Sequence, residues 1–261
     1  MLFNSYPFLL LFLPVSLAAY HGFVRLGLPR AALLAVTFLS FVFYAQWEPR
    51  HLPVLALSIA GNLVVGRMLL SATRHRELLL ALGVGANLAT LGFYKYAGFV
   101  ASNLAAILGA GVALPPIALP IGISFFTFLQ IAYLVDCHRR SGATTDWLRY
   151  AFFVSFFPHL IAGPLLHLRE MTPQLDRDPR RRLRLNLAVG LFIFVVGLAK
   201  KVIVADTFAV PADAVFDQAH ATGAAPDLLS AWSAALSYSF QIYFDFSAHS
   251  DMAVGLSRMF G

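Results

Sequence analysis

The chain has few charged residues and a single cysteine. Only 12% of its 261 residues are charged and 59% are hydrophobic, whereas a soluble domain carries about twice that charged fraction. This composition excludes an ordinary soluble domain and predicts a protein that sits in lipid. Because Cys137 is the only cysteine, no disulfide can form within the chain. Residues 1–6 lack Lys and Arg, while Arg25 and Arg30 follow the first apolar run, which is the reverse of the charge order of a signal peptide.

Several sequence motifs of enzymes are also absent. The eight histidines form no H-E-x-x-H or Cys/His spacing, so we expect no metal site. Neither a G-x-S-x-G elbow nor a Walker loop is present, which argues against a serine hydrolase and against nucleotide hydrolysis. The net charge of +6 comes mostly from arginines in short connections. In a membrane protein, such arginines indicate orientation and contact with lipid headgroups rather than binding of nucleic acid.

Long apolar runs predict an all-α polytopic membrane protein that forms a single transmembrane domain over residues 1–261. Crossing a bilayer takes about 20 mostly apolar residues. Seven segments meet this requirement, and they are residues 7–24, 31–47, 52–70, 78–100, 117–135, 185–205 and 228–246.

The positive-inside rule orients these spans. Arginines follow the first, third and fifth spans, and they are Arg25, Arg30, Arg67, Arg74, Arg76, Arg139, Arg140 and Arg149. Those connections should be cytoplasmic, which puts the N-terminus outside. The connection at 205–227 carries aspartates but no Lys or Arg, so it should also lie outside.

Residues 152–168 break the alternation of spans. The apolar part is too short to cross, and Arg149 on one side and the arginine-rich run 169–184 on the other should both stay in the cytoplasm. Its helix breakers are Pro158, Gly163 and Pro164. We predict a re-entrant segment, because broken backbone survives at membrane depth only inside protein or beside a wet cavity.

The histidines of this segment allow two interpretations. His159 and His167 flank Gly163 and Pro164, and all four residues are candidates for lining a cavity that opens to the cytoplasm. An imidazole can act as a general base near neutral pH. The simpler alternative is that each histidine is a hydrogen-bonded structural residue.

A second polar group lies among aromatic residues near the end of the chain. The candidates for lining a substrate path here are Tyr243, Asp245, Ser247, His249 and Asp251. On a helix, Asp245 and His249 share a face, as do Ser247 and Asp251. Ionisable groups at bilayer depth usually mark an interior or a reaction path, although mutual pairing that pins the helix bundle is the structural alternative.

Three further charged residues need an explanation. Lys200 and Lys201 lie towards the outer end of their predicted span, against the positive-inside trend. They either snorkel, pair with a buried acid or indicate a different topology. Asp136, which is followed by Arg139 and Arg140, is most simply a solvated helix end.

Four blocks in this order carry a family resemblance. They are Met1-Leu-Phe-Asn-Ser-Tyr-Pro-Phe8, Leu119-Pro-Ile-Gly-Ile-Ser-Phe-Phe-Thr-Phe128, Phe156-Phe-Pro-His-Leu-Ile-Ala-Gly-Pro164 with Glu170-Met-Thr-Pro-Gln174, and Gln241-Ile-Tyr-Phe-Asp-Phe-Ser247 with Ser250-Asp-Met-Ala253. Together they resemble the membrane-bound O-acyltransferases, in the bacterial branch typified by the alginate O-acetylation protein and its D-alanyl-transfer relatives.

The resemblance implies an acyltransferase of the bacterial inner membrane with no bound cofactor. In such proteins an acyl group, typically acetyl, passes from cytoplasmic acetyl-CoA through a tunnel towards the outer face. A periplasmic partner protein then commonly places it on hydroxyls of an exported, alginate-like polysaccharide. Such transfer needs a base for the acceptor and a donor that stabilises the oxyanion.

The resemblance also implies that the family's essential histidine lies downstream of Gly261, in an aromatic and arginine-rich segment. We therefore assign no catalytic residue within residues 1–261 and expect this stretch to be inactive alone. The family often has Tyr at the position of His249, and both side chains offer a polar tip.

Two other functional classes remain open. A transporter or channel would also place Asp and Lys residues beside an interrupted Pro/Gly segment, although no inverted pair of interrupted segments is visible. A non-catalytic scaffold subunit is the third interpretation.

Overall fold

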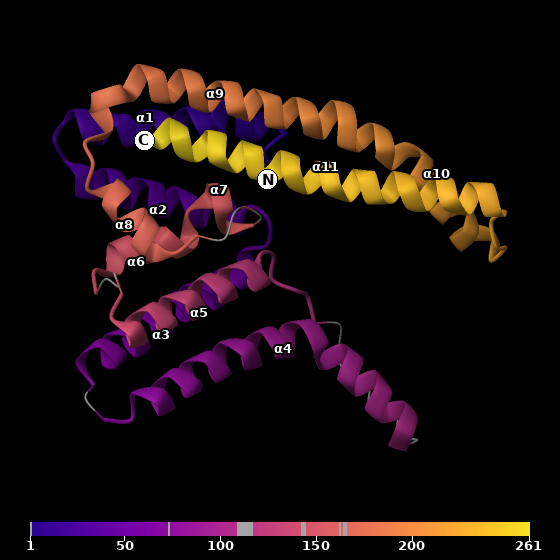
Figure 1. Cartoon of the computed structure of the whole chain (residues 1–261), viewed down its shortest axis with the longest axis horizontal. Coiled ribbons are helices and arrows are strands. Elements are labelled where there is room, and N and C mark those ends of the chain that lie inside the picture. The colour runs from indigo at the N-terminus through magenta and orange to yellow at the C-terminus, as the bar shows by residue number, and fades with distance from the viewer. Residues whose placement is uncertain (1, 73, 109–116, 142–144, 162, 164–165) are drawn as a thin grey trace. The chain divides into compact units, whose positions relative to one another are not determined.

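The computed structural model describes residues 2–72, 74–108, 117–141, 145–161, 163 and 166–261, and every regular element among them is helical (Figure 1). In chain order, the elements are the π-helix η1 (Phe8–Phe12), α1 (Leu13–Arg25), α2 (Pro29–Ala45), the 3₁₀-helix η2 (Pro49–His51), α3 (Leu52–Ser71), α4 (Arg76–Leu108), α5 (Ile123–Arg139), α6 (Trp147–Ser155), α7 (Phe157–Leu160), α8 (Leu168–Leu175), the 3₁₀-helix η3 (Pro179–Arg182), α9 (Leu183–Ala199), the π-helix η4 (Lys200–Ala205), α10 (Asp206–Thr222) and α11 (Leu228–Phe260). The predicted all-α fold is confirmed.

Among the described residues, four helical runs are long and apolar enough to cross a membrane. They are Phe8–Arg25, Pro49–Ser71, Arg76–Ile107 and Pro179–Thr222, and each coincides with one of the predicted spans or contains it, to within one residue. The last run has 44 residues, which at about 1.5 Å per residue is roughly twice the ~30 Å hydrocarbon core. The prediction ended this span at residue 205, but the helix continues through η4 into α10. The total of seven spans stays a prediction.

The chain divides into two compact units. The first contains the N-terminal residues up to His21 together with Pro179–Gly261, and the second contains Gly22–Ile161 with the segment that ends at Asp178. The first unit therefore holds η1, most of α1 and the helices from α9 to α11. The second holds α2 to α8.

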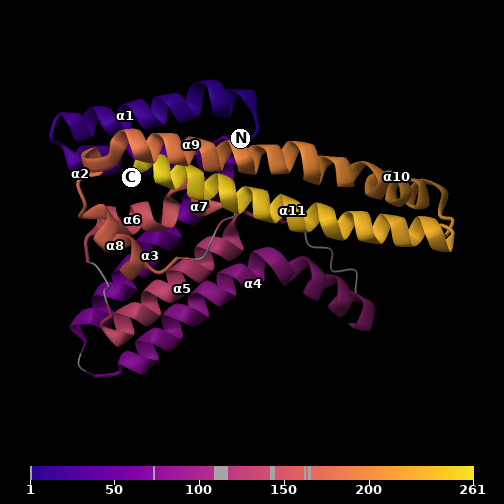
Figure 2. The same cartoon turned by 45° about the horizontal axis from the view of Figure 1, so that its top comes forward.

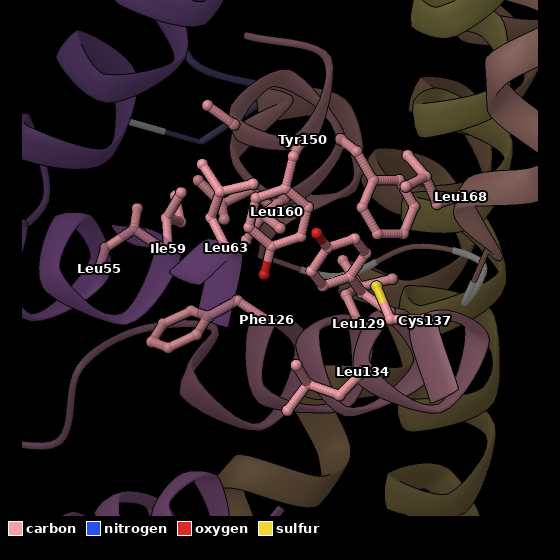
Figure 3. Packing of buried hydrophobic residues seen from close by; sticks show 14 of the residues in the cluster. Leu55, Ile59, Leu63, Phe126, Leu129, Leu134, Cys137, Tyr150, Leu160 and Leu168 are labelled. Atoms are coloured by element: carbon pink, nitrogen blue, oxygen red, sulfur yellow. The ribbon is translucent and has the colours of Figure 1, made fainter. Parts of the chain in front are cut away.

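The core of the second unit forms where α3, α5, α6 and the short helices α7 and α8 meet. Its buried side chains are those of Leu55, Phe126, Leu134, Cys137, Tyr150, Leu160 and Leu168, among others (Figure 3). Within this apolar core, the Asn62 amide donates to Gln130 Oε1 at 2.7 Å, and the Asn87 amide donates to Asn62 Oδ1 at 2.6 Å. Polar side chains that bond across helices are a common means of joining helices in membranes, so this network ties α3, α4 and α5 together.

The segment predicted to be broken contains two separate short helices. α6 ends at Ser155, and Phe156 leaves the helical region with φ −54° and ψ 111° before α7 begins. Pro158 has no N–H, and its ring would meet the carbonyl four residues earlier, so one continuous helix is disfavoured here. All four residues of α7 are buried, and the Phe157 N–H donates to Ser40 Oγ of α2 at 3.1 Å. Entry of this segment into the bilayer and its return stay a prediction.

Gly122 is the residue that lets α7 approach the start of α5. It precedes α5 with a left-handed φ of +70°, and a Cβ at this position would lie 2.6 Å from the Leu160 carbonyl oxygen. Glycine suits both the φ and the close contact.

Candidate functional site

The polar residues near the end of the chain lie on α11, which runs antiparallel to α9 (Figures 1 and 2). Small residues bring the two backbones together. A Cβ on Gly255 would lie 2.7 Å from the Gly190 carbonyl oxygen, and a Cβ on Gly197 would lie 2.9 Å from the Ala248 carbonyl oxygen. Such close approach through small residues is typical of helix pairs in membranes. These contacts fix α11 against α9 one turn from the candidate polar residues.

The N-terminal half of α11 packs against α10 through aromatic rings. The centroids of Phe208 and Phe240 are 5.3 Å apart, and those of Phe216 and Tyr238 are 5.7 Å apart. Asp227 caps the start of α11, because its Oδ1 accepts the N–H of Leu229 at 3.0 Å and that of Ser230 at 3.1 Å. A hydrogen bond from the Ser230 hydroxyl to the Asp227 carboxylate has the largest effect on its pKa. Together with the two backbone bonds, it lowers the pKa of Asp227.

Charged side chains of α11 and of the π-helical turn η4 meet between the glycine contacts with α9 and the aromatic contacts with α10. Lys200 Nζ lies 2.5 Å from Asp251 Oδ2 and donates to Ser247 Oγ at 3.0 Å. Lys201 Nζ lies 2.7 Å from Asp245 Oδ1 and 2.9 Å from Asp206 Oδ1. Of the three alternatives left open for the two lysines, the structure selects pairing with acids. The partner Asp206, the first residue of α10, was not recognised from the sequence.

His249 is attached to Asp245 more weakly than the lysine is. Its Nδ1–H donates to the backbone carbonyl of Asp245 at 3.3 Å, and the carboxylate Oδ1 is 3.9 Å away. The His249 ring packs against Phe3, with 5.8 Å between the ring centroids. Thus α11 meets the N-terminal block of the chain at this histidine.

Tyr243 differs from the other candidates on α11 because it takes no part in the ion pairs and is 66% exposed. Ile242 and Phe246 are also exposed, and at about 100° per residue the three side chains fall within one sector of the helix. They therefore form one exposed face of α11.

In the second unit, His159 is a buried structural residue. It is 3% exposed, and its Nε2–H donates to the Phe153 carbonyl at 2.7 Å. Its ring meets Phe156 edge-on, with the centroids 5.5 Å apart. A buried imidazole with one strong backbone bond links α7 to α6, so the structural interpretation of this histidine has the stronger support.

His167 pairs with an acid that we had expected to be solvated. Its Nδ1 lies 3.4 Å from Asp136 Oδ2, and the Asp136 side chain is only 5% exposed. The expectation of a solvated helix end at Asp136 is therefore wrong. Besides His167, the Ser141 hydroxyl lies 3.4 Å from Asp136 Oδ1, so the carboxylate has polar neighbours from both sides of the following loop.

A surface ion pair holds the other end of α8. The Arg149 guanidinium on α6 lies 2.6 Å from Asp176 Oδ1. Hydrogen bonding to this guanidinium lowers the pKa of Asp176. Such an exposed pair contributes little to stability by itself, but it shows which face of α8 is turned towards α6.

The candidates of the broken segment are not equally described. Gly163 is buried, whereas Pro164 lies outside the described residues. His159 and His167 belong to the second unit, and the candidates on α11 belong to the first. Lining of a common cavity by these residues stays a prediction. Among the described residues, no group of three or more His, Cys, Asp or Glu side chains is arranged to hold a metal ion.

Comparison with known proteins places the chain in a family. The family model for the membrane-bound O-acyltransferases matches residues 123–261, which include the broken segment, η4 and all of α11. The chain belongs to the membrane-bound O-acyltransferase family.

Individual relatives match along the whole chain. It is 38% identical over 291 residues to the peptidoglycan O-acetyltransferase of Helicobacter pylori, a match that covers 100% of this chain and 54% of that protein. It is 39% identical to the probable alginate O-acetylase AlgI of Pseudomonas putida over 270 residues and to that of Pseudomonas aeruginosa over 269 residues, with 100% of this chain and 53% and 50% of those proteins covered. The chain thus spans about half the length of these relatives.

Proposed function

We propose that this chain is part of a membrane O-acetyltransferase that modifies an exported polysaccharide. The observation that carries this proposal is the identity of 37–39% along the whole chain to proteins named as O-acetylases of alginate or as a peptidoglycan O-acetyltransferase. The helical architecture supports it, because a transfer across a bilayer needs a set of apolar helices that shields a path.

The proposed donor is acetyl-CoA, which would approach from the cytoplasm near the broken segment with His159 and His167. The acetyl group would then pass towards the outer face of the inner membrane, where a periplasmic partner protein would place it on a polysaccharide hydroxyl. Physically, a tunnel lets the charged donor remain inside while only a small neutral group crosses. In the transfer, the C–S bond of the thioester breaks as a C–O bond to the acceptor forms, and the acceptor proton passes through a base to the departing CoA thiolate; we propose that this base lies outside residues 1–261.

The test is to express the complete coding region in a bacterium whose own polysaccharide O-acetylase has been deleted. Acetate released from purified polysaccharide by mild alkali is then measured against a strain that expresses residues 1–261 alone. We expect ester-linked acetate only with the complete gene product. Solute flux through the purified protein in vesicles, without acetate on the polysaccharide, would support a transporter instead.

A further inference from the structure

Two consecutive lysines on the π-helical turn η4 reach the same neighbouring helix. Lys200 contacts Asp251 at 2.5 Å and Ser247 at 3.0 Å, and Lys201 contacts Asp245 at 2.7 Å. On a regular α-helix, consecutive side chains point about 100° apart. A π-helical turn adds a residue to the turn and is often found at functional sites. Here η4 brings both ammonium groups to α11.

The packing of α11 changes at this turn. On one side, Gly197 touches the backbone at Ala248, so the helices lie very close. On the other side, the ring of Phe208 stacks on Phe244 with 6.1 Å between the centroids, which needs more space. Both contacts are made without charged groups. The ion pairs lie at the junction and make specific contacts there.

Charged groups are costly in these apolar surroundings, so the ion pairs restrict the rotation of α11. The side chains of Lys200 and Lys201 are 27% and 20% exposed, on a helical run that is apolar enough to cross a membrane. A charge that leaves its partner in such apolar, mostly covered surroundings loses its compensation. Asp245 and Asp251 point about 120° apart on α11, so any rotation of the helix moves at least one of them away from its lysine, and the two pairs together favour one rotation.

We propose that Lys200 and Lys201 are positioning residues for the transfer reaction. They hold Asp245 and Asp251 towards η4 and thereby present the exposed face of α11, which carries Tyr243 with Ile242 and Phe246, to the acyl path. In this arrangement the two aspartates orient α11 and do not touch the acyl group. The assignment rests on the proposed function.

The test uses membranes of the deletion strain described above, prepared with its periplasmic proteins and containing the complete gene product, with labelled acetyl-CoA as donor and alginate oligosaccharide as acceptor. For Lys201→Met we expect kcat per folded molecule to fall at least tenfold, with KM for acetyl-CoA changed less than twofold, because the geometry of transfer is lost and the donor site is not. Lys201→Arg keeps the charge and should retain more than half of kcat. The matched control is Lys95→Met, since Lys95 is exposed on α4 and its Nζ lies over the ring of Tyr96, 5.5 Å from the centroid.

A variant in which the two charges are exchanged distinguishes loss of the ion pair from failure to fold. Lys200→Asp combined with Asp251→Lys restores an ion pair at the same place, so we expect it to recover both abundance and kcat relative to Lys200→Asp alone. A merely structural pair would lower abundance or the thermal midpoint while leaving kcat per folded molecule at the wild-type value. That result in Lys201→Met would overturn the proposal.

A second readout does not depend on activity. In a Cys137→Ser background, Phe216→Cys and Tyr238→Cys place thiols where the two rings now meet, with 5.7 Å between their centroids. A short bis-maleimide should link them, and Lys201→Met should lower the yield at least threefold because α11 turns. An unchanged yield would overturn the positioning role even if the wild type proved inactive. An inactive wild type with a lowered yield would overturn the proposed function but support the control of α11 rotation by the lysines.

Discussion

Adding one methyl group to α11 tests the close packing of the first unit. In Gly255→Ala, the new Cβ would lie 2.6 Å from the Phe194 nitrogen and 2.7 Å from the Gly190 oxygen, both of which are backbone atoms. These distances are roughly 0.7 Å shorter than an ordinary van der Waals contact, and no side-chain rotation can relieve them. Overpacking costs about 1–3 kcal/mol, whereas Ala in place of Gly in a helix gains up to about 1 kcal/mol. We expect the free energy of unfolding to fall by about 1–2 kcal/mol.

The measurement is an SDS titration of the purified protein in detergent micelles, followed by the loss of helical circular dichroism. Gly85→Ala on α4 is the matched control, because its Cβ would meet nothing within 4 Å, so only the gain in helix propensity remains. The two variants should therefore shift the midpoint in opposite directions. If Gly255→Ala is as stable as the wild type or more stable, α9 and α11 do not pack through these glycines, and the ion pairs at η4 lose their geometric basis.

Three further predictions concern the core, the cap of α11 and the orientation. Asn62→Leu removes one hydrogen-bond partner of Gln130 and one of Asn87 and should lower the free energy of unfolding by about 1–3 kcal/mol in the same titration; an unchanged midpoint would show that the network is dispensable. Because the folded state lowers the pKa of Asp227, its cap should stabilise α11 fully above the unfolded pKa of about 4 and lose this effect as the pH falls through the lower folded pKa. The protection of the Leu229 amide, measured as its hydrogen-exchange rate relative to the intrinsic rate at each pH, should thus fall at the acid end, and Asp227→Asn should remove that pH dependence. Reporters fused after residue 184 and near residue 220 should indicate the cytoplasm and the outside, respectively; the reverse result would overturn the orientation.

The elements that could be predicted from the sequence are those that depend on the residues of one short segment. Long apolar runs predicted the spans at Phe8–Arg25, Pro49–Ser71 and Arg76–Ile107 to within a few residues at most ends, because composition alone decides whether a helix suits lipid. The interruption around Pro158 was also readable, since the missing N–H of proline is a local property. The buried state of Asp136 was not, because its partner His167 lies about 30 residues further along the chain.

The lysines show why the candidate site could not be predicted in the same way. The sequence spacing placed Asp245 with His249 and Ser247 with Asp251 on shared faces, which is correct for a helix but does not identify their partners. Those partners come from η4, and a π-helical turn has no strong sequence signal, so neither the register nor the approach of Lys201 could be derived. The sequence did indicate that Lys200 and Lys201 need partners, because they lie towards the outer end of a predicted span. A basic residue there that does not set orientation must be neutralised locally, and the nearest acids on the neighbouring helix belong to the motif that the sequence had already singled out.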